Sequence, residues 1–307
     1  MRWLEDGSPA TVAGALKVVA PAVGDLPVVV RETLGEADPL WWAGSAVVGG
    51  RFVAKFAWSR PAGLRLAHEI AVLAALESAV PFLPEVVASS TDPVLLVTRM
   101  VPGTSLFELA DSADWDQVAR QLAQFLGALH GSAARERLEA AIGEVPPAAM
   151  QPATTDTLRE QFGQWARPDQ RAAVIRWCDL ADDVLASPPQ SVVVHGDLHG
   201  GNQVWDGGQL SAVVDFETAG LADAEYDLRA FPATGPGLEL LTATLRHYRE
   251  ITGRALSAER VMAWHLRTAL GDALWRSEAG VPLPDHRTPV AWVDDLAARF
   301  SALGIDP

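Results

Sequence analysis

The chain has 307 residues, of which 49% are hydrophobic and 21% charged, so it can bury a large core and is not intrinsically disordered. Its formal net charge of −15 argues against a nucleic-acid partner, because binding to phosphates needs a basic surface, and favours a cationic small molecule. The single cysteine, Cys178, excludes an intramolecular disulfide, which suits a reducing cytoplasm. No signal-peptide pattern and no bilayer-spanning apolar run occur, so we expect no membrane partner.

Valine-rich segments separated by turn residues predict three strands near the N-terminus, over residues 27–34, 40–48 and 51–58. A helix is predicted before them, over residues 9–19. The turn at 35–39 holds one glycine and two acidic residues, whose side chains we expect to point to solvent. The three strands would form a small sheet with short connections.

One lysine stands out in the third predicted strand. Lys55 lies in the apolar run FVAKFAW, although the chain has only one other lysine. A lysine in such a strand needs a partner for its charge. The next predicted helix, residues 61–78, carries Glu69, fourteen positions after Lys55. We therefore expect Lys55 and Glu69 to pair.

Two more strands are predicted over 85–89 and 94–98, followed by a proline- and glycine-containing connection at 99–103. The chain then becomes mainly helical, and residues 131–150 are ambiguous. The predicted helices, with Asp114 as an N-cap for the first, cover residues 115–130, 155–166, 168–185, 237–253, 257–275 and 289–303.

The segment 192–231 interrupts the helices with three short predicted strands, 192–194, 203–205 and 210–214. Asp197 follows the first strand and Asp215 ends the third, with Asn202 between them. Phosphoryl transfer from ATP needs a carboxylate beside the attacking hydroxyl and oxygen ligands for Mg²⁺. We interpret Asp197 as the group that takes the hydroxyl proton, and Asn202 and Asp215 as metal ligands.

The motif H-G-D-L-H-x-x-N, followed thirteen residues later by D-F-E, resembles the catalytic and metal loops of aminoglycoside phosphotransferases. That family is grouped with choline kinase, macrolide kinases and other small-molecule kinases of the protein-kinase-like fold. The resemblance implies that Asp197 is catalytic and that Asn202 and Asp215 bind magnesium.

The order of residues along the chain extends this resemblance. It implies that Lys55 contacts the α- and β-phosphates and is held by Glu69. The segment LLVTRMVPGTSL resembles the hinge between the lobes of the family, where backbone groups of Arg99 and Val101 would bind adenine. Asp227, in Tyr-Asp-Leu, resembles a structural aspartate at a helix start that steadies the catalytic loop.

Two other interpretations of the motif remain to be weighed. The run Gly-Asp-Leu-His-Gly at 196–200 also matches metallophosphoesterases, but neither an upstream Asp-x-His nor a downstream Gly-Asn-His block is present, so a two-metal hydrolase lacks ligands. A non-catalytic nucleotide-binding module usually lacks the catalytic aspartate, the metal aspartate or the lysine. All three are present here.

The C-terminal helices supply the expected acceptor wall. Residues 264–278 contain tryptophans and carboxylates, which suit the ring faces and ammonium groups of an amino sugar. Within this segment we name Asp272, Trp275 and Glu278 as substrate-binding candidates. Tryptophans at helical spacing also fit a plain hydrophobic core.

The sequence therefore predicts an α+β, two-lobed, protein-kinase-like fold. Residues 1–98 would form a five-stranded nucleotide-covering lobe with one helix, 99–103 the hinge, and 104–307 a helical lobe with the catalytic loops and acceptor site. The expected activity is ATP- and Mg²⁺-dependent phosphorylation of a small-molecule hydroxyl, with GTP as another possible donor. An aminoglycoside or related amino sugar is the first acceptor considered; a macrolide, choline, homoserine or a sugar is the alternative.

Overall fold

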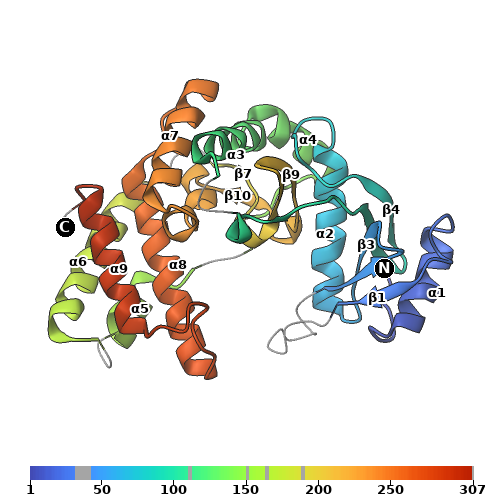
Figure 1. Ribbon diagram of the computed structural model, residues 1–307, viewed down its shortest axis with the longest axis horizontal. Coiled ribbons are helices and arrows are strands. Elements are labelled where there is room, and N and C mark those ends of the chain that lie inside the picture. The colour runs from blue at the N-terminus through green and yellow to red at the C-terminus, as the bar shows by residue number, and fades with distance from the viewer. Residues whose placement is uncertain (32–42, 110–112, 150–151, 163–165, 188–190, 306–307) are drawn as a thin grey trace.

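The computed structural model describes residues 1–31, 43–109, 113–149, 152–162, 166–187 and 191–305, which form two lobes (Figure 1). The described part of the N-terminal lobe holds five strands, as expected, and two helices rather than one, because the helix before the first strand also packs on the sheet. In chain order these are α1 (Pro9–Val19), β1 (Val28–Val30), β2 (Gly44–Val48), β3 (Phe52–Phe56), α2 (Arg60–Leu76), β4 (Val86–Thr91) and β5 (Val94–Arg99).

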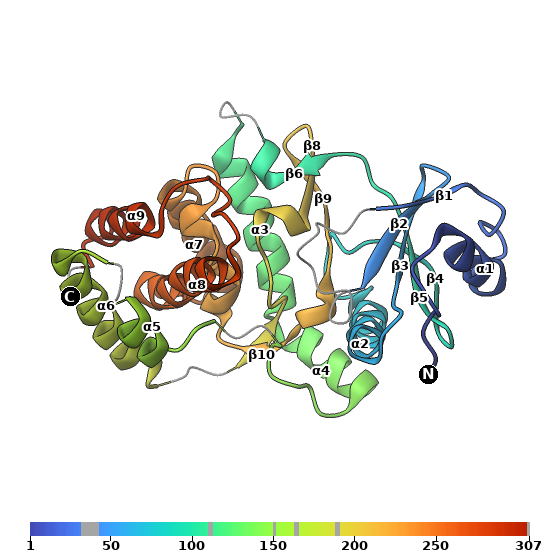
Figure 2. The ribbon, with the colours of Figure 1, turned by 90° about the horizontal axis from the view of Figure 1, so that it is seen from below.

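The N-terminal sheet is antiparallel, in the order β1-β2-β3-β5-β4. Helix α1 packs on one face of it, and α2 lies on the face turned toward the helical lobe (Figures 1 and 2). Burial alternates along β3, so Ala54 and Phe56 join the core under α1. Lys55 therefore projects from the opposite face, toward α2.

Helix α2 begins where its sequence predicts a start. The hydroxyl of Ser59 accepts a hydrogen bond from the backbone N–H of Ala62, and Pro61 lies in the first turn, where its missing N–H costs nothing. Leu66 and Leu73 are buried against the sheet. Glu69 lies on the same helix and is also buried, which requires a partner for its charge.

The second lobe is mainly helical and contains the catalytic segment. Its elements are β6 (Thr104–Ser105), α3 (Trp115–Leu129), α4 (Ser132–Ile142), α5 (Thr155–Phe162), α6 (Pro168–Leu185), β7 (Val192–Val194), β8 (Gln203–Asp206), β9 (Gln209–Val213), β10 (Gly220–Ala222), α7 (Leu238–Thr252), α8 (Ala258–Ala279) and α9 (Pro289–Ala302). The two small sheets, β6-β8-β9 and β7-β10, place the loop after β7 and the end of β9 on the side that faces the N-terminal lobe.

Among the described residues, the helical lobe takes part in three hydrophobic clusters. One joins α3 and α7 to β7, β9 and α2, and so continues into the N-terminal lobe. The second lies between α5, α6, α8 and α9, where Trp177 stacks on Phe300 with ring centroids 5.2 Å apart. The third is small and joins Val192 and Val194 of β7 to Ala224 and Tyr226. Within the described ranges, no helix is both long and apolar enough to span a bilayer.

Several predicted elements agree with the structure to within a few residues, including α1 and α6, whose bounds match. The Asp114 cap is confirmed, since its carboxylate accepts from the Gln117 N–H at 3.1 Å. Helix α8 runs four residues beyond the prediction, to Ala279, and the ambiguous region contains α4. The turn 35–39, with its solvent-facing acids, and parts of the strands flanking it lie outside the described residues.

The first prediction concerns the shared core. Leu122 on α3 is fully buried in the cluster that joins the lobes. Leu122→Ala should lower the free energy of unfolding by about 2–5 kcal/mol, because the change removes apolar contacts and leaves a cavity. Urea unfolding followed by circular dichroism measures the effect. Val18→Ala, at an exposed position of α1, is the control and should change stability by less than about 0.5 kcal/mol.

Candidate active site

One ammonium group joins three distant segments of the chain. The Nζ atom of Lys55, on β3, lies 2.7 Å from an Oε atom of Glu69 on α2 and 2.7 Å from an Oδ atom of Asp215, just after β9. The expected pair of Lys55 and Glu69 is therefore present. Burial alone would lower the pKa of Lys55, but the neighbouring carboxylates outweigh it and raise that pKa well above its ordinary value.

The two carboxylates that hold Lys55 are themselves fixed. Glu69 also accepts a hydrogen bond from the backbone N–H of Phe216, so α2 is tied to the segment that follows Asp215. Asp215 has φ +74°, a left-handed conformation that costs a non-glycine residue roughly 1–2 kcal/mol. Although burial favours the neutral acid, the Lys55 charge holds the pKa of Asp215 below its usual value.

The loop between β7 and β8 is shaped by one glycine and one buried carboxylate. Gly196 has φ +86°, and a Cβ atom there would come within 2.5 Å of the Thr218 carbonyl oxygen, so only glycine fits. The Asp227 carboxylate accepts from the backbone N–H groups of His195 and Gly196, at 2.8 and 2.9 Å. These bonds fix the start of the loop that presents Asp197.

Asp227 belongs to a buried polar network. Its Oδ2 atom lies 3.3 Å from Nε2 of His130, whose Nδ1 lies 3.3 Å from the Tyr248 hydroxyl. Burial disfavours the carboxylate, yet the hydrogen bond with His130 and those from the loop amides hold the pKa of Asp227 below its ordinary value. Asp227 lies within a 3-10 turn, Ala224–Leu228, rather than at the start of an α-helix as expected. The expected contact with the catalytic loop is nevertheless made.

The carboxylate of Asp197 lies between two nitrogen groups. Nη2 of Arg229 is 3.6 Å from its Oδ1 atom, and Nε2 of His199 is 3.6 Å from Oδ2. Arg229 is buried and also donates to the Gly196 carbonyl at 2.7 Å, so it stays behind the loop. Nδ2 of Asn202 donates to the Asp197 carbonyl at 2.9 Å. The Asp197 side chain is 29% exposed and can reach a substrate.

The acidic side chains at this site suit a divalent cation. Glu69, Asp215 and Glu217 each place a carboxylate oxygen within 4.8 Å of the others. Three carboxylates around one ammonium leave excess negative charge, and Mg²⁺ prefers oxygen ligands. Because Glu69 is engaged by Lys55 and Phe216, the carboxylates with ligand capacity to spare are Asp215 and Glu217. Asn202 adds its side-chain Oδ1, since only its Nδ2 is held, by the Asp197 carbonyl. The donor set therefore fits Mg²⁺.

Glu217 was not assigned a role from the sequence, although it ends the D-F-E motif. Its side chain is buried beside Asp215, with the Arg65 guanidinium 3.9 Å away. Burial, followed by the charge of Asp215, raises the pKa of Glu217 to about 7. A cation bound at Asp215 would offset the repulsion between these two carboxylates.

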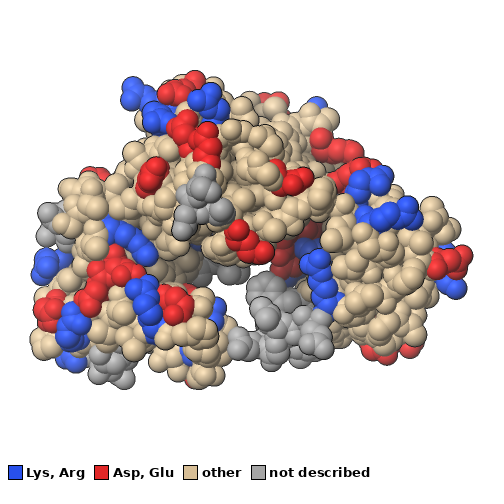
Figure 3. Space-filling view, viewed as in Figure 1, with Lys and Arg blue, Asp and Glu red and all other residues tan. Residues whose placement is uncertain are grey.

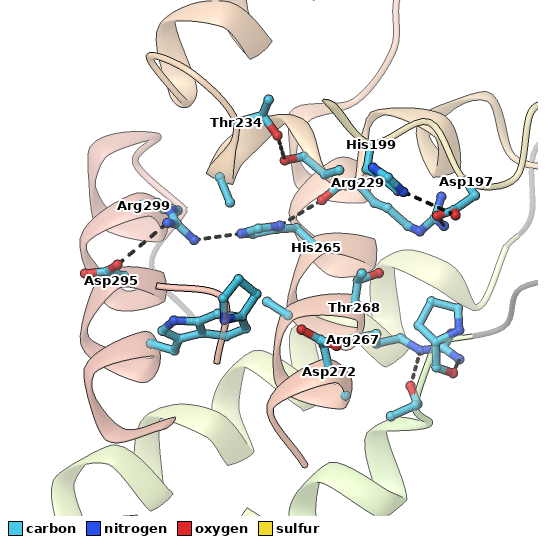
Figure 4. A pocket seen from close by; sticks show the side chains of 18 of the residues that line it. Asp197, His199, Arg229, Thr234, His265, Arg267, Thr268, Asp272, Asp295 and Arg299 are labelled. Carbon is cyan, nitrogen blue, oxygen red and sulfur yellow. Dashed lines mark hydrogen bonds and ion pairs between the residues drawn. The ribbon is translucent and has the colours of Figure 1, made fainter. Parts of the chain in front are cut away.

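A cavity of about 830 Å³ opens beside Asp197, between the catalytic loop and helices α8 and α9 (Figure 4). Its lining residues all lie between Phe107 and Arg299, in the helical lobe, and they combine apolar and aromatic groups with charged ones. Figure 3 shows the hollow between the two lobes, with acidic and basic side chains along its edges. The charged residues of the lining are Asp197, Arg229, Arg267, Asp272, Asp285, Arg287, Asp295 and Arg299.

The predicted acceptor residues are only partly brought together. Asp272 and Trp275 line the cavity, and Trp275 is 50% exposed. Glu278 is exposed and is not among the lining residues, because the last turn of α8 extends past the cavity. Asp272 is engaged by Arg276 at 2.9 Å. Trp264, also in this segment, donates to Asp223 and packs on Tyr226, which is a structural role.

His265 lines the cavity but is held by protein groups. Its Nδ1 atom lies 2.8 Å from the Arg229 carbonyl oxygen, so it carries the proton, and Nε2 lies 3.0 Å from an Arg299 Nη atom (Figure 4). Burial, reinforced by the Arg299 charge, lowers the pKa of His265 to about 3. His265 is therefore neutral and positions Arg299 rather than transferring protons.

The connection predicted over 99–103 begins one residue later, at Met100, because Arg99 is the last residue of β5. The backbone N–H of Arg99 donates to the Glu85 carbonyl at 2.9 Å, and its guanidinium pairs with the Glu85 carboxylate at 2.6 Å. This leaves the Arg99 carbonyl, rather than its N–H, as the group that could meet a nucleotide base. Val101, two residues further on, is half-buried.

Three residues near Asp197 were missed from the sequence alone. His199 and Arg229 flank its carboxylate, and Phe107 reaches the cavity from the segment after β6. A signal existed only for His199, which stands two positions after Asp197 in the quoted motif. Phe107 and Arg229 lie 90 positions before and 32 positions after Asp197, so only folding shows their proximity.

Two comparisons at the level of sequence identify relatives of this chain. Residues 33–281 match the profile of the phosphotransferase enzyme family. Viomycin phosphotransferase from Streptomyces vinaceus is 32% identical over 257 residues, covering 76% of this chain and 84% of that protein.

Solved structures share the fold at lower identity. A GDP complex of aminoglycoside 2′-phosphotransferase-IIIa superimposes with a TM-score of 0.67 at 18% identity, covering 96% of this chain and 99% of the other. A macrolide 2′-phosphotransferase from Brachybacterium faecium gives a TM-score of 0.60 at 20% identity, over 92% and 97% of the two chains. These similarities show the two-lobed fold predicted from the sequence.

The raised pKa of Glu217 generates a stability prediction for the metal-free protein. Between its ordinary pKa of 4.5 and its folded value of about 7, the folded state binds more protons than the unfolded one. Stability should therefore fall as pH rises through this window, by about 2 kcal/mol from this group. Glu217→Gln should remove that part of the slope.

Urea unfolding of both forms in EDTA, from about pH 5 to about pH 8, measures the difference in slope. Glu85→Gln, at an exposed carboxylate of the N-terminal lobe, is the control and should keep the wild-type slope. Parallel curves for wild type and Glu217→Gln would show that Glu217 titrates normally.

Proposed function

This chain belongs to the phosphotransferase enzyme family. We propose that it transfers the γ-phosphoryl group of a nucleoside triphosphate, bound next to Lys55, to a hydroxyl of an acceptor bound next to Asp197. The enzyme is a small-molecule kinase. The observation that carries the site assignment is the convergence of Lys55, Glu69 and Asp215 from three segments. The loop that presents Asp197 lies next to them, since His195 and Asn202 of that loop both bond to Val214, the residue before Asp215.

In this proposal Asp197 orients the acceptor hydroxyl and takes its proton as the oxygen attacks the γ-phosphorus. Phosphoryl transfer requires little covalent chemistry from the protein, so catalysis comes from positioning and charge. Lys55, locked by Glu69, would contact the phosphates. Asn202 and Asp215, with Glu217 beside them, would hold Mg²⁺, which when bound neutralises charge on the phosphates.

The nucleotide base would lie at the connection after β5. Its partners would be the Arg99 carbonyl and the Val101 backbone N–H, with ATP the first donor to test and GTP the second. Nucleotide-bound relatives of this fold include both GDP and ATP complexes, which supports testing both donors.

The acceptor would occupy the cavity beside Asp197. Its volume, about 830 Å³, suits a molecule of antibiotic size. We take viomycin as the first acceptor to test, because the alignment with viomycin phosphotransferase covers most of this chain and most of that protein. Aminoglycosides such as kanamycin and streptomycin, found in complexes of similar fold, come next, followed by macrolides. Asp272 and Trp275 would contribute to binding.

The decisive experiment measures nucleoside diphosphate release with ATP or GTP and Mg²⁺ across these acceptors. Asp197→Asn should lower kcat by roughly 10²- to 10⁴-fold, because the proton acceptor is lost while the shape is kept. Binding of the nucleotide should change little. The matched control is Asp206→Asn, at an exposed hairpin position, which should turn over normally. Undiminished turnover by Asp197→Asn would refute its role.

Another prediction tests the contact between Lys55 and the phosphates. Lys55→Met removes the charge but keeps the length of the side chain, and should lower kcat/KM for the nucleotide by about 10²-fold. Because Lys55→Met alone leaves the buried Glu69 carboxylate without its partner, Lys55→Met/Glu69→Gln is the better-matched variant for stability. The thermal unfolding transition shows whether the double variant folds. A folded double variant with wild-type kcat/KM would contradict the assignment of Lys55 as a phosphate contact.

A further inference from the structure

Phe107 is an exposed aromatic ring at the rim of the cavity. It lies in the turn η1 (Leu106–Glu108) after β6, its surface is 60% exposed, and it lines the same cavity as Asp197. A concave cavity lined by apolar and aromatic side chains with a few polar groups is the usual form of a small-molecule site, and Phe107 contributes an aromatic face to this one. Phe107 has no part in the transfer chemistry described above.

The position of Phe107 is fixed by its neighbours. The preceding residue, Leu106, is buried in the main core, and Ser105 on β6 pairs with Val204 on β8. The Ser105 hydroxyl also donates to the Glu108 carboxylate at 2.9 Å, which closes the turn. The ring is therefore presented by an anchored segment, and its exposure does not come from a loose loop.

The ring of Phe107 stacks on the imidazole of His199. Their centroids are 6.3 Å apart and their planes differ by 11°. The arrangement needs glycine at position 200, where a Cβ atom would lie 2.8 Å from the Phe107 ring. The catalytic loop and the turn after β6 thus form one continuous aromatic surface that begins next to Asp197.

The hydrogen bonds of His199 define which nitrogen faces the cavity. Its Nδ1 atom accepts from the backbone N–H of Gly201 at 3.0 Å, so in the neutral ring the proton is on Nε2. Nε2 lies 3.6 Å from Oδ2 of Asp197, and His199 is 42% exposed (Figure 4). A donor and an acceptor therefore stand side by side, where a substrate hydroxyl could bond to both.

From this geometry we propose that Phe107 and His199 form an acceptor-binding subsite for a cyclic, hydroxyl-bearing molecule. The inference rests on the proposed function and specifies how its acceptor is held. A ring face of the acceptor packs on Phe107. The oxygen of the reactive hydroxyl accepts a hydrogen bond from His199 Nε2–H, and the hydroxyl proton points to Asp197. During transfer a bond forms between this oxygen and the γ-phosphorus, and the bond from that phosphorus to the β-phosphate oxygen breaks. Asp197 takes the hydroxyl proton in the same step.

The two residues should affect different kinetic constants. Phe107→Ala removes the packing surface and should raise KM for the acceptor by about threefold to tenfold, with a smaller change in kcat. Phe107→Tyr should restore most of the affinity. His199→Phe keeps the stack but removes the Nε2–H donor, together with the Nδ1 acceptor of the Gly201 N–H. It should lower kcat by about threefold to tenfold with little change in acceptor KM. The Kd for the nucleotide with Mg²⁺ should stay within about twofold of wild type in each.

The assay uses the full chain with viomycin and kanamycin as probes. The matched control is Ile175→Ala, at a similarly exposed apolar position on α6, away from the cavity lining, and it should leave acceptor KM unchanged. If the wild type turns over an acceptor and Phe107→Ala leaves the KM for that acceptor unchanged, the proposed subsite is refuted while the proposed function stands. Equal effects of Phe107→Ala and Ile175→Ala would do the same. Absence of turnover by wild type on the whole acceptor panel would contradict the proposed function and this inference with it.

Discussion

The bonds of the Lys55 ammonium are the interaction on which the site depends. One charged group connects a strand of the sheet, the helix that covers it and the end of a hairpin in the helical lobe. A lysine in an apolar strand needs such partners, and the buried Glu69 carboxylate is in turn satisfied by Lys55 and the Phe216 N–H. The same ionic cluster that closes the lobes on each other is the one that would receive phosphates and metal.

A second buried carboxylate organises the other half of the site. Asp227 bonds two consecutive amides of the catalytic loop, while Gly196 supplies the positive φ that the loop requires. This division of roles resembles that around Lys55: a buried charge fixes the backbone, and a less buried carboxylate, Asp197, is left to meet the substrate. Rigid support of this kind keeps a reactive group in place without covering it.

The cavity that would hold the acceptor is less acidic than the composition of the chain suggests. Although the chain carries a net charge of −15, the cavity lining holds as many arginines as aspartates. Asp285 and Asp295 are both engaged by Arg287, and Asp272 by Arg276. A cationic acceptor would have to compete with these pairs, so ring packing and hydrogen bonds next to Asp197 gain importance over simple charge attraction.

The sequence by itself determined the fold class and most helices, because strand periodicity and capping residues are local properties of the chain. Motif spacing also singled out Lys55, Glu69, Asp197, Asn202, Asp215 and Asp227 as the candidates for the site. It placed Asp272 and Trp275 on the cavity wall but also Glu278, since helical spacing does not show where a cavity ends. Only the tertiary structure decided that His199 and Arg229 flank Asp197, that Phe107 stacks on His199 and that Glu217 joins the acidic cluster. Such contacts join positions far apart in sequence or depend on the direction of one side chain. They form only when the lobes have packed, so the local sequence does not show them.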